Sequence, residues 1–197
     1  MRKLTYYVAS TIDGFVAGPD GGDPSGPGGF WAPGEDYVGH MVANYPETLP
    51  GPAHEPLGIT EPGARFDTVV EGRASYQIGL DAGVPDAYPH LHHVVFSRTL
   101  ESVPATDVEL VSTDPVEKVR ELKQQAGKGI WLVGGGTLAG TLYDEIDELI
   151  IKLSPITVGT GIGLFGAHAK FEPANWEVTD TAALPSGVFF LTYDRRK

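Results

Sequence analysis

Short apolar runs recur along the chain and are separated by turn residues. Runs of four to eight apolar or β-branched residues bounded by Gly, Pro, Asp or Ser are typical of buried strands. We therefore expect strands at residues 4–10, 66–72, 93–97, 108–111, 130–133 and 148–154. Near the end of the chain, residues 176–181 and 188–193 flank a Pro-Ser-Gly turn, which predicts an antiparallel hairpin.

Stretches with helical spacing lie between these runs. We expect helices at residues 35–45, 73–78, 115–126 and 137–143. Pro46 ends the first helix, Asp114 and Pro115 mark the start of the third, and Gly127 ends it. Strands that alternate with helices and close with a hairpin predict an α/β fold with a mixed central sheet.

Two stretches rich in glycine and proline interrupt this pattern. Nine of the twelve residues 18–29 are Gly or Pro, and residues 46–63 contain five prolines. We expect irregular loops over about 18–34 and 46–63. The chain has neither an internal repeat nor a linker that would divide it, so one domain over residues 1–197 is predicted.

Composition narrows the classes of partner and chemistry. The formal net charge of −12 makes nucleic acid and anionic membranes unsuitable as general partners. The absence of cysteine excludes disulfides, thiolate metal sites and cysteine nucleophiles. No apolar run is long enough to span a membrane and the N-terminus shows no signal core, so we expect a cytoplasmic protein.

Residues 129–140 carry the most informative motif, in which a buried strand, three glycines and a helix start follow one another. Gly134, Gly135 and Gly136 allow the backbone to approach a phosphate, and the free N–H groups of the helix start favour an anion. The turn matches G-x-G-x-x-A, but the next strand, residues 148–154, has its acidic residues at the wrong end for a Rossmann site. No Lys-Ser or Lys-Thr pair follows, which excludes a Walker A loop. A tight turn without a ligand is the alternative.

Two other strand ends have similar chemistry. One contains Gly72, Arg73 and Ser75, and the other contains Ser97, Arg98 and Thr99. Ligands of open sheets collect outside the carboxyl ends of the strands, and arginine binds phosphate well. Three such junctions together predict a site for a phosphate-bearing cofactor or substrate.

The order and spacing of these segments resemble the dihydrofolate reductase-like superfamily. The resemblance is closer to the C-terminal reductase domain of the bifunctional riboflavin-biosynthesis deaminase-reductase, in its free-standing form. The matching segments are residues 9–17, 19–21, 72–76, 97–99, 133–137, 147–149, 155–161 and 164–165. The resemblance implies a three-layer fold with a mixed central sheet and a C-terminal antiparallel hairpin, NADPH as cofactor, and a homodimer.

The resemblance also assigns cofactor contacts by position. Gly134, Gly135, Gly136 and Thr137 would bind the pyrophosphate of NADPH, with Gly72, Arg73 and Ser75 beside it. Ser97, Arg98 and Thr99 would bind the adenosine ribose and its 2′-phosphate, and Gly159 and Thr160 would lie near the nicotinamide. The cofactor would supply the hydride. Since there is no cysteine, the zinc site of the deaminase half is not expected.

Reduction of an imine or carbonyl also needs a proton donor. The candidate catalytic residues are Asp13, Glu35 and Asp36, and water is a further source. Asp13 follows the first strand and would also contact the substrate, but beside Gly14 it is equally a turn residue. Glu35 and Asp36 open a helix, where negative charge is favourable without any catalytic role. Trp31 would stack on a flat substrate or simply pin its loop.

The cluster His90, His92 and His93 is interpreted as solvated histidines, and no metal site is expected. The sequence therefore predicts an NADPH-dependent reductase of a small heterocyclic substrate. The predicted enzyme resembles the 5-amino-6-(5-phosphoribosylamino)uracil reductase of riboflavin biosynthesis. The alternatives are dihydrofolate reductase-type activity and a non-catalytic NADPH-binding module.

Overall fold

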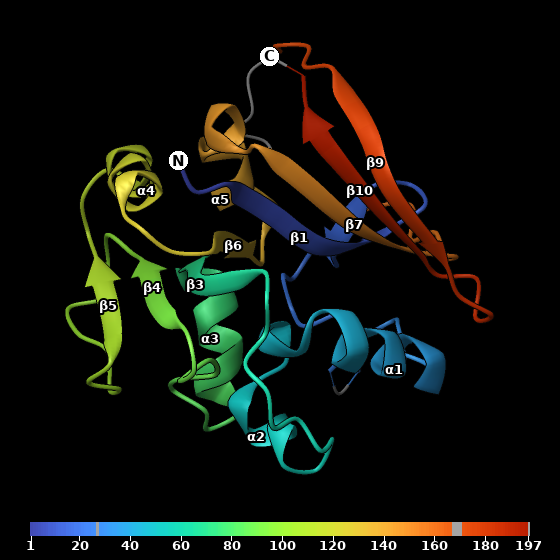
Figure 1. The fold of residues 1–197 in the computed structure, drawn as a ribbon, viewed down its shortest axis with the longest axis horizontal. Helices are drawn as coiled ribbons and strands as arrows, with labels where there is room; N and C mark the ends of the chain where they lie inside the picture. Colours follow the sequence, from blue (N-terminus) through green and yellow to red (C-terminus); the bar gives the residue numbers. More distant parts are fainter. Residues whose placement is uncertain (27, 167–170, 197) are drawn as a thin grey trace.

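A computed structural model describes residues 1–26, 28–166 and 171–196 of the protein. Its centre is an eight-stranded sheet in the order β5-β4-β3-β6-β1-β7-β10-β9 (Figure 1). The strands are β1 (Leu4–Thr11), β3 (Phe66–Gly72), β4 (His92–Phe96), β5 (Val108–Val111), β6 (Gly129–Val133), β7 (Glu148–Ser154), β9 (Trp176–Ala183) and β10 (Phe189–Arg195).

Helices cover both faces of this sheet. They are α1 (Glu35–Asn44), α2 (Gly51–His54), α3 (Arg73–Asp81), α4 (Pro115–Gln124) and α5 (Gly136–Thr141), with 3₁₀ turns at Pro46–Thr48 and Tyr143–Glu145. The helices α4 and α5 lie on one face, and α1, α2 and α3 lie on the other (Figure 1). The predicted three-layer α/β fold is confirmed.

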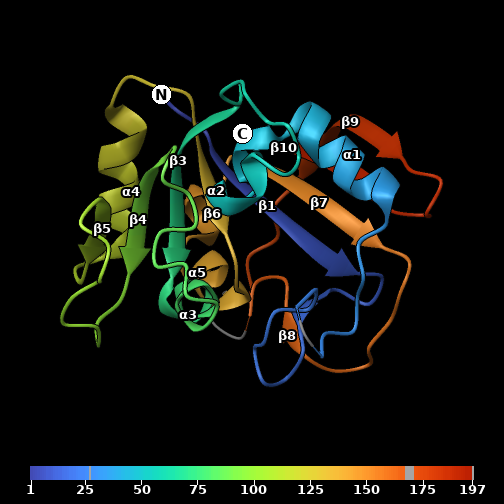
Figure 2. The same ribbon diagram turned by 90° about the horizontal axis from the view of Figure 1, so that it is seen from below.

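The direction of the strands decides where loops from distant parts of the chain meet. Strand β1 is parallel to both β6 and β7, and β3 is parallel to β4 and β6. Only β10 opposes the others in this sheet, since it is antiparallel to both β7 and β9, which confirms the predicted hairpin. The carboxyl ends of β1, β3, β4, β6 and β7 consequently point to one edge of the molecule (Figure 2).

Alternation along the strands divides the core into layers. Tyr6 and Leu132 face α4 and α5, whereas their neighbours Tyr7 and Trp131 face α1. All four side chains are almost fully buried. Each such side chain contributes about 1.5–3 kcal/mol through burial, so the central strands hold the site on a rigid base.

Two features differ from the sequence prediction. A second sheet pairs β2 (Phe15–Ala17) with β8 (Ile162–Gly163), and both strands are too short to show a periodic pattern. The expected irregular loop over 46–63 contains the first 3₁₀ turn and α2 instead. This segment is ordered by Glu47, whose buried carboxylate accepts hydrogen bonds from the Arg65 and Phe66 amides at 2.7 and 3.0 Å.

The expectation of solvated histidines is wrong for His93, which is fully buried on β4. Its Nε2 lies 2.7 Å from Glu71 Oε1 and its Nδ1 lies 2.9 Å from Asp86 Oδ1. Burial lowers the pKa of His93, but the two carboxylates outweigh that effect and raise it. Within the ranges described, no three His, Asp or Glu residues form a group that would hold a metal ion, and no helix has the length and apolarity to cross a bilayer.

Candidate active site

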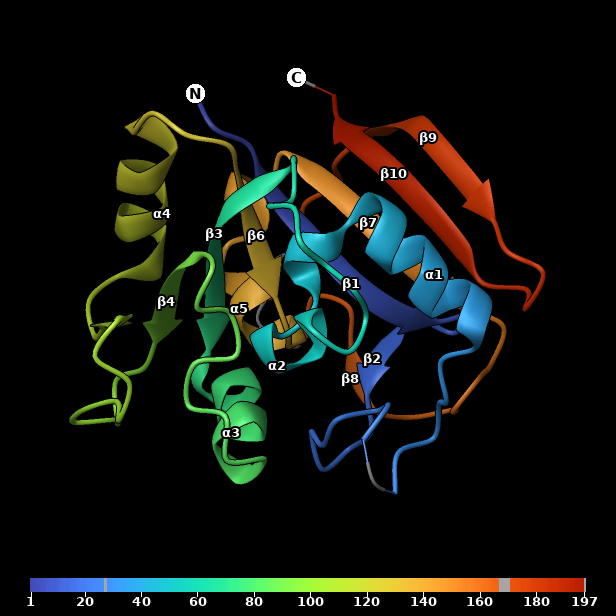
Figure 3. The same ribbon diagram turned by 60° about the horizontal axis from the view of Figure 1, so that its bottom comes forward.

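The residues that the sequence singles out gather along the carboxyl edge of the sheet. The β6–α5 turn, the start of α3 and the loop after β4 lie side by side there, and the β2–β8 pair lies beyond the ends of β1 and β7 (Figure 3). In open α/β sheets this edge is where ligands bind.

The glycine turn after β6 is tightly packed on two sides and open between them. At Gly134, with φ +90°, an added Cβ would lie 1.7 Å from Ser75 Oγ. At Gly136 it would lie 2.1 Å from the Gly163 carbonyl oxygen. At Gly135 it would meet nothing within 4 Å, and the Gly135 amide donates to Ser75 Oγ at 3.2 Å. The turn is therefore fixed by its neighbours and presents bare backbone at one position.

The hydroxyl of Tyr6 on β1 contacts the backbone of this turn. Its hydroxyl lies 2.9 Å from the Leu164 carbonyl and 3.2 Å from the Gly134 carbonyl. Burial raises the pKa of Tyr6, so the hydroxyl remains a donor at any physiological pH. One buried group thus joins the glycine turn to the segment after β8.

The two arginine-bearing junctions are in contact with each other. Arg73 Nη1 donates to Thr99 Oγ1 at 2.9 Å, which links the start of α3 to the loop after β4. Ser97 Oγ accepts hydrogen bonds from the amides of Thr99 and Leu100, so it shapes this loop. Arg98 is exposed within it. Ser97 is buried, and its hydroxyl serves the loop rather than open solvent.

Asp13 fastens a second loop to the end of β1. Its carboxylate accepts hydrogen bonds from Thr11 Oγ1 at 2.6 Å, the Gly159 amide at 2.7 Å and the Val158 amide at 3.1 Å. The Thr11 hydroxyl and these two amides lower the pKa of Asp13. A carboxylate that is ionised at neutral pH is not suited to donate a proton. Thr160, beside this anchor, is exposed.

The other two carboxyl groups lie at the start of α1. Asp36 accepts a hydrogen bond from the Ser186 amide at 2.7 Å, which ties α1 to the turn of the C-terminal hairpin. That hydrogen bond lowers the pKa of Asp36. Glu35 occupies the first position of α1 and is exposed. Both placements favour a role in the helix start, where negative charge is stabilising.

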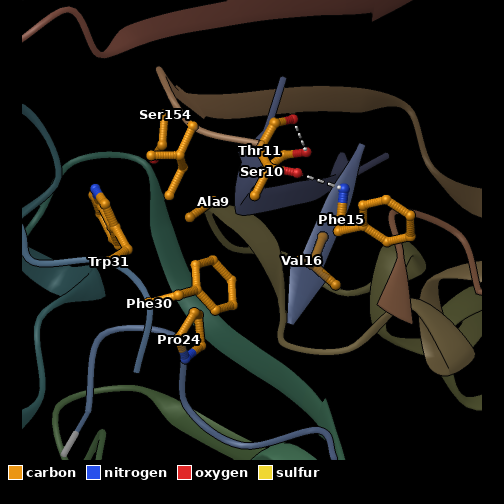
Figure 4. A pocket seen from close by; sticks show the side chains of 10 residues that line it. Ala9, Ser10, Thr11, Phe15, Val16, Pro24, Phe30, Trp31 and Ser154 are labelled. Atoms are coloured by element: carbon orange, nitrogen blue, oxygen red, sulfur yellow. Dashed lines mark hydrogen bonds between the residues drawn. The ribbon is translucent and has the colours of Figure 1, made fainter. Parts of the chain in front are cut away.

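A pocket lies at the ends of β1 and β7. The loop before α1 supplies Pro24, Phe30 and Trp31, and these face Ala9 and Ser154 on the strands (Figure 4). The remaining lining residues are Ser10, Thr11, Phe15, Val16 and Ile156. Trp31 packs edge-on against Tyr37 of α1 at 4.8 Å between ring centroids, which fixes its orientation. This apolar, partly aromatic wall suits one face of a flat ring.

Lys152 was not predicted from the sequence as a site residue. It stands on β7 directly opposite Ala9, a residue of the pocket wall, and two positions before Ser154 on the same face. Lys152 is half-buried, and the desolvation of its ammonium group lowers its pKa to about 7. A single lysine inside the apolar run 148–154 is the signal that could have found it.

The chain resembles a known family over more than half of its length. Residues 71–190 match the model of the RibD C-terminal domain. Two relatives come from Bacillus subtilis strain 168 and are uncharacterized proteins. YwjB is 26% identical over 166 residues, covering 83% of each chain. YyaP is 28% identical over 205 aligned positions, covering 98% of this chain and 94% of the relative.

Solved structures share the fold. A putative riboflavin biosynthesis protein from Shewanella sp. PV-4 superposes with a TM-score of 0.69 at 22% identity, covering 100% of both chains. A diaminohydroxyphosphoribosylaminopyrimidine deaminase/5-amino-6-(5-phosphoribosylamino)uracil reductase from Thermotoga maritima gives 0.64 at 16% identity, covering 99% of this chain and 57% of that one. Dihydrofolate reductase from Enterococcus faecalis, complexed with NADP(H), gives 0.65 at 16% identity over 99% and 97% of the chains. These likenesses confirm the dihydrofolate reductase-like fold.

The packing of the glycine turn yields a prediction about stability. Gly136→Ala should lower the free energy of unfolding by about 1–3 kcal/mol, because its Cβ would overlap a backbone carbonyl that cannot rotate away. Gly135→Ala is the matched control and should change stability by less than about 0.5 kcal/mol, since its Cβ points into open space. Urea denaturation of the three proteins measures both effects. Equal stabilities would show that the turn is not clamped.

Proposed function

Because the chain belongs to the RibD C-terminal domain family, we propose that it is an NADPH-dependent reductase of a small heterocyclic substrate. The family and the fold support a reductase-type role. One observation carries the finer proposal. A glycine turn that is open at Gly135 shares an edge of the sheet with an aromatic-walled pocket. A cofactor on the turn and a ring in the pocket would meet near the end of β1.

The residues at this edge fit a dinucleotide phosphate. In a chain of net charge −12, Arg73 begins α3, whose Ser75 contacts the Gly135 amide, and it reaches Thr99 in the loop that carries Arg98. Arginine forks bind phosphate oxygens in pairs, and bare glycine backbone allows close approach. Local cations thus offset the repulsion that the overall charge would exert on the cofactor.

We assign the contacts as follows. The pyrophosphate would bind Gly134, Gly135, Gly136 and Thr137, with Gly72, Arg73 and Ser75 beside it, and Thr137 is exposed at this point. The adenosine 2′-phosphate would bind Arg98 and Thr99 on the loop that Ser97 shapes, and the nicotinamide would lie near Gly159 and Thr160. When bound, NADPH would supply the hydride.

The chain itself would position the substrate and keep water out. Trp31 and Phe30 would cover one face of the ring, and Ala9 would leave room for it against β1. Asp13 would hold the loop that carries Gly159 rather than move a proton. The substrate we favour is 5-amino-6-(5-phosphoribosylamino)uracil or a related heterocycle, acted on in the cytoplasm.

Titration with NADPH and with NADH tests the proposal. NADPH should quench tryptophan fluorescence saturably and bind at least about tenfold more tightly than NADH, because only NADPH has the 2′-phosphate. Gly135→Ala should weaken NADPH binding by about tenfold or more at unchanged stability, since its methyl group would stand where the phosphate approaches. Loss of saturable binding for both cofactors in the wild type would overturn the proposal. Tight NADPH binding without oxidation on pyrimidine, pterin or folate substrates would favour a non-catalytic binding module.

Arg98→Ala distinguishes the contribution of the 2′-phosphate to binding from that of the rest of the cofactor. We expect NADPH affinity to fall by about tenfold and NADH affinity to stay within about twofold, since a charged hydrogen bond is worth about 1.5–3 kcal/mol. Arg120→Ala on α4, which removes an exposed arginine paired with Glu145, is the matched control and should change neither affinity. Equal losses for the two cofactors would show that Arg98 does not contact the 2′-phosphate.

The proposed homodimer is tested by light scattering. Strand β9 leaves an exposed edge of the sheet, and Val178 on it is 55% exposed. An open strand edge is able to pair with a second copy. We expect a mass of two chains at micromolar concentration. A mass of one chain at high concentration would contradict the dimer.

A further inference from the structure

Lys152 lies between the α1 layer of the core and the pocket. Strand β7 alternates its side chains, so Ile150, Lys152 and Ser154 share one face. Ile150 belongs to the buried cluster under α1, and Ser154 lines the pocket. Lys152 is opposite Ala9 on β1 and opposite Phe190 on β10. The residue is therefore a neighbour of two residues of the pocket wall, Ala9 and Ser154.

The ammonium group of Lys152 rests on aromatic rings instead of a carboxylate. Its Nζ lies 4.1 Å from the ring centroid of Tyr7 and 5.9 Å from that of Tyr37. Such contacts stabilise a cation by about 0.5–2 kcal/mol. Among the residues that the structure describes, none makes a hydrogen bond or an ion pair to Lys152 Nζ. Lys152 is half-buried, and an aromatic contact alone does not restore the hydration that its ammonium group loses there.

The titratable groups described around Lys152 do not stabilise its protonated form. Burial raises the pKa of Tyr7 on β1 and of Tyr37 on α1, so both rings are neutral at physiological pH. On α1, His40 packs 4.2 Å from the ring of Phe190, and burial lowers its pKa. With no anion facing it, burial alone sets the pKa of Lys152 near 7. Packing gives no reason for a lysine at this position, where an apolar side chain would cost less.

We propose that Lys152 is the catalytic acid of this site and that it directs the pocket toward heterocycles with a neutral acceptor atom. This inference rests on the proposed function. The hydride would reach the carbon of a C=N or C=O bond, and the Lys152 ammonium would give its proton to the nitrogen or oxygen. The double bond becomes a single bond, and Lys152 is left as a neutral amine. Water then returns the proton.

Geometry allows the transfer. A lysine side chain has four rotatable carbon–carbon bonds, and the residue beside it on β1 is the small Ala9, which lines the pocket. An acid whose pKa lies near the working pH is the most effective proton donor. The pKa values of Asp13 and Asp36 are lowered and so move away from the working pH, which leaves both groups ionised and unable to compete for this role.

The same charge selects the substrate. Among the residues that the structure describes, those that line the pocket include no Asp or Glu. An ammonium that turns toward such a pocket favours a carbonyl oxygen or an imine nitrogen and repels a ring that binds as a cation. The pocket therefore suits a uracil-type ring better than a heterocycle that is protonated on binding.

Lys152→Met is the variant that tests this inference, with Lys118→Met on α4 as control because Lys118 pairs with Glu109 far from the pocket. The first readout needs no cofactor. In protein labelled with ¹³C at the lysine Cε, the resonance absent from Lys152→Met should titrate in the wild type with a midpoint near 7. A midpoint above 9.5 would overturn the inference.

The second readout follows NADPH oxidation with 5-amino-6-(5-phosphoribosylamino)uracil as the probe. Lys152→Met should lower kcat at least about 100-fold while NADPH affinity stays within about twofold. The wild-type rate should fall as the pH rises through 7, because the ammonium loses its proton, and the residual rate of the variant should show no such step. A variant that retains the wild-type rate and pH profile would overturn the inference. Dihydrofolate should react at least about tenfold more slowly than the uracil probe; faster turnover would overturn the substrate selection.

Failure of the proposed function gives a different pattern. A wild type that oxidises NADPH with neither probe would refute the reductase assignment and the acid role together. The titration of Lys152 is measured without cofactor or substrate, so it would still report whether the pKa of this lysine is lowered. If Lys152 titrates near 7 but the wild type is inactive, the proposed reaction is wrong. If Lys152 titrates at an ordinary lysine pKa but the wild type is active, the choice of Lys152 as the acid is wrong.

Discussion

The parallel pairing of β1 with β6 on one side and with β7 on the other is the constraint on which the site depends. Because all three strands run the same way, the glycine turn after β6, the Asp13 turn after β1 and the loop after β7 end at the same edge. Parallel strands require crossover helices, and these bury both faces of the sheet. The site is therefore built from loops whose starting points cannot move independently.

Hydrogen bonds then connect these loops across long distances in the chain. Asp13 holds the amides of residues 158 and 159, Tyr6 holds the carbonyls of Gly134 and Leu164, and Arg73 reaches Thr99. Each of these links joins the ends of different strands. The residues of the proposed cofactor site and of the pocket consequently share one framework, although they come from segments distributed along most of the chain.

Much of the fold could be predicted from the sequence because local signals were strong. The apolar runs gave β5 and β7 their observed bounds, and Asp114 caps α4 by accepting a hydrogen bond from the Val116 amide, as its position before Pro115 indicated. The β2–β8 pair could not be predicted, since its strands have three and two residues and depend on partners far along the chain. His93 and Glu47 are buried polar groups whose partners come from other segments, so no local pattern reveals them. The residues of the proposed site were predictable as strand ends, but Lys152, the proposed acid, lies within a strand, where its proximity to the pocket depends on which face the pocket occupies.

The pocket has two walls of different origin, and this has a consequence for how such proteins diversify. Ala9 and Ser154 stand on central strands that end at the same edge as the glycine turn, whereas Pro24, Phe30 and Trp31 stand on a glycine- and proline-rich loop outside the sheet. Loops of this kind accept insertions and substitutions at small thermodynamic cost. Substitutions and insertions in residues 18–34 can therefore change which ligand the pocket accepts, while the strand wall and the glycine turn remain unchanged. Relatives that share the fold would then differ in what they reduce mainly through this one loop.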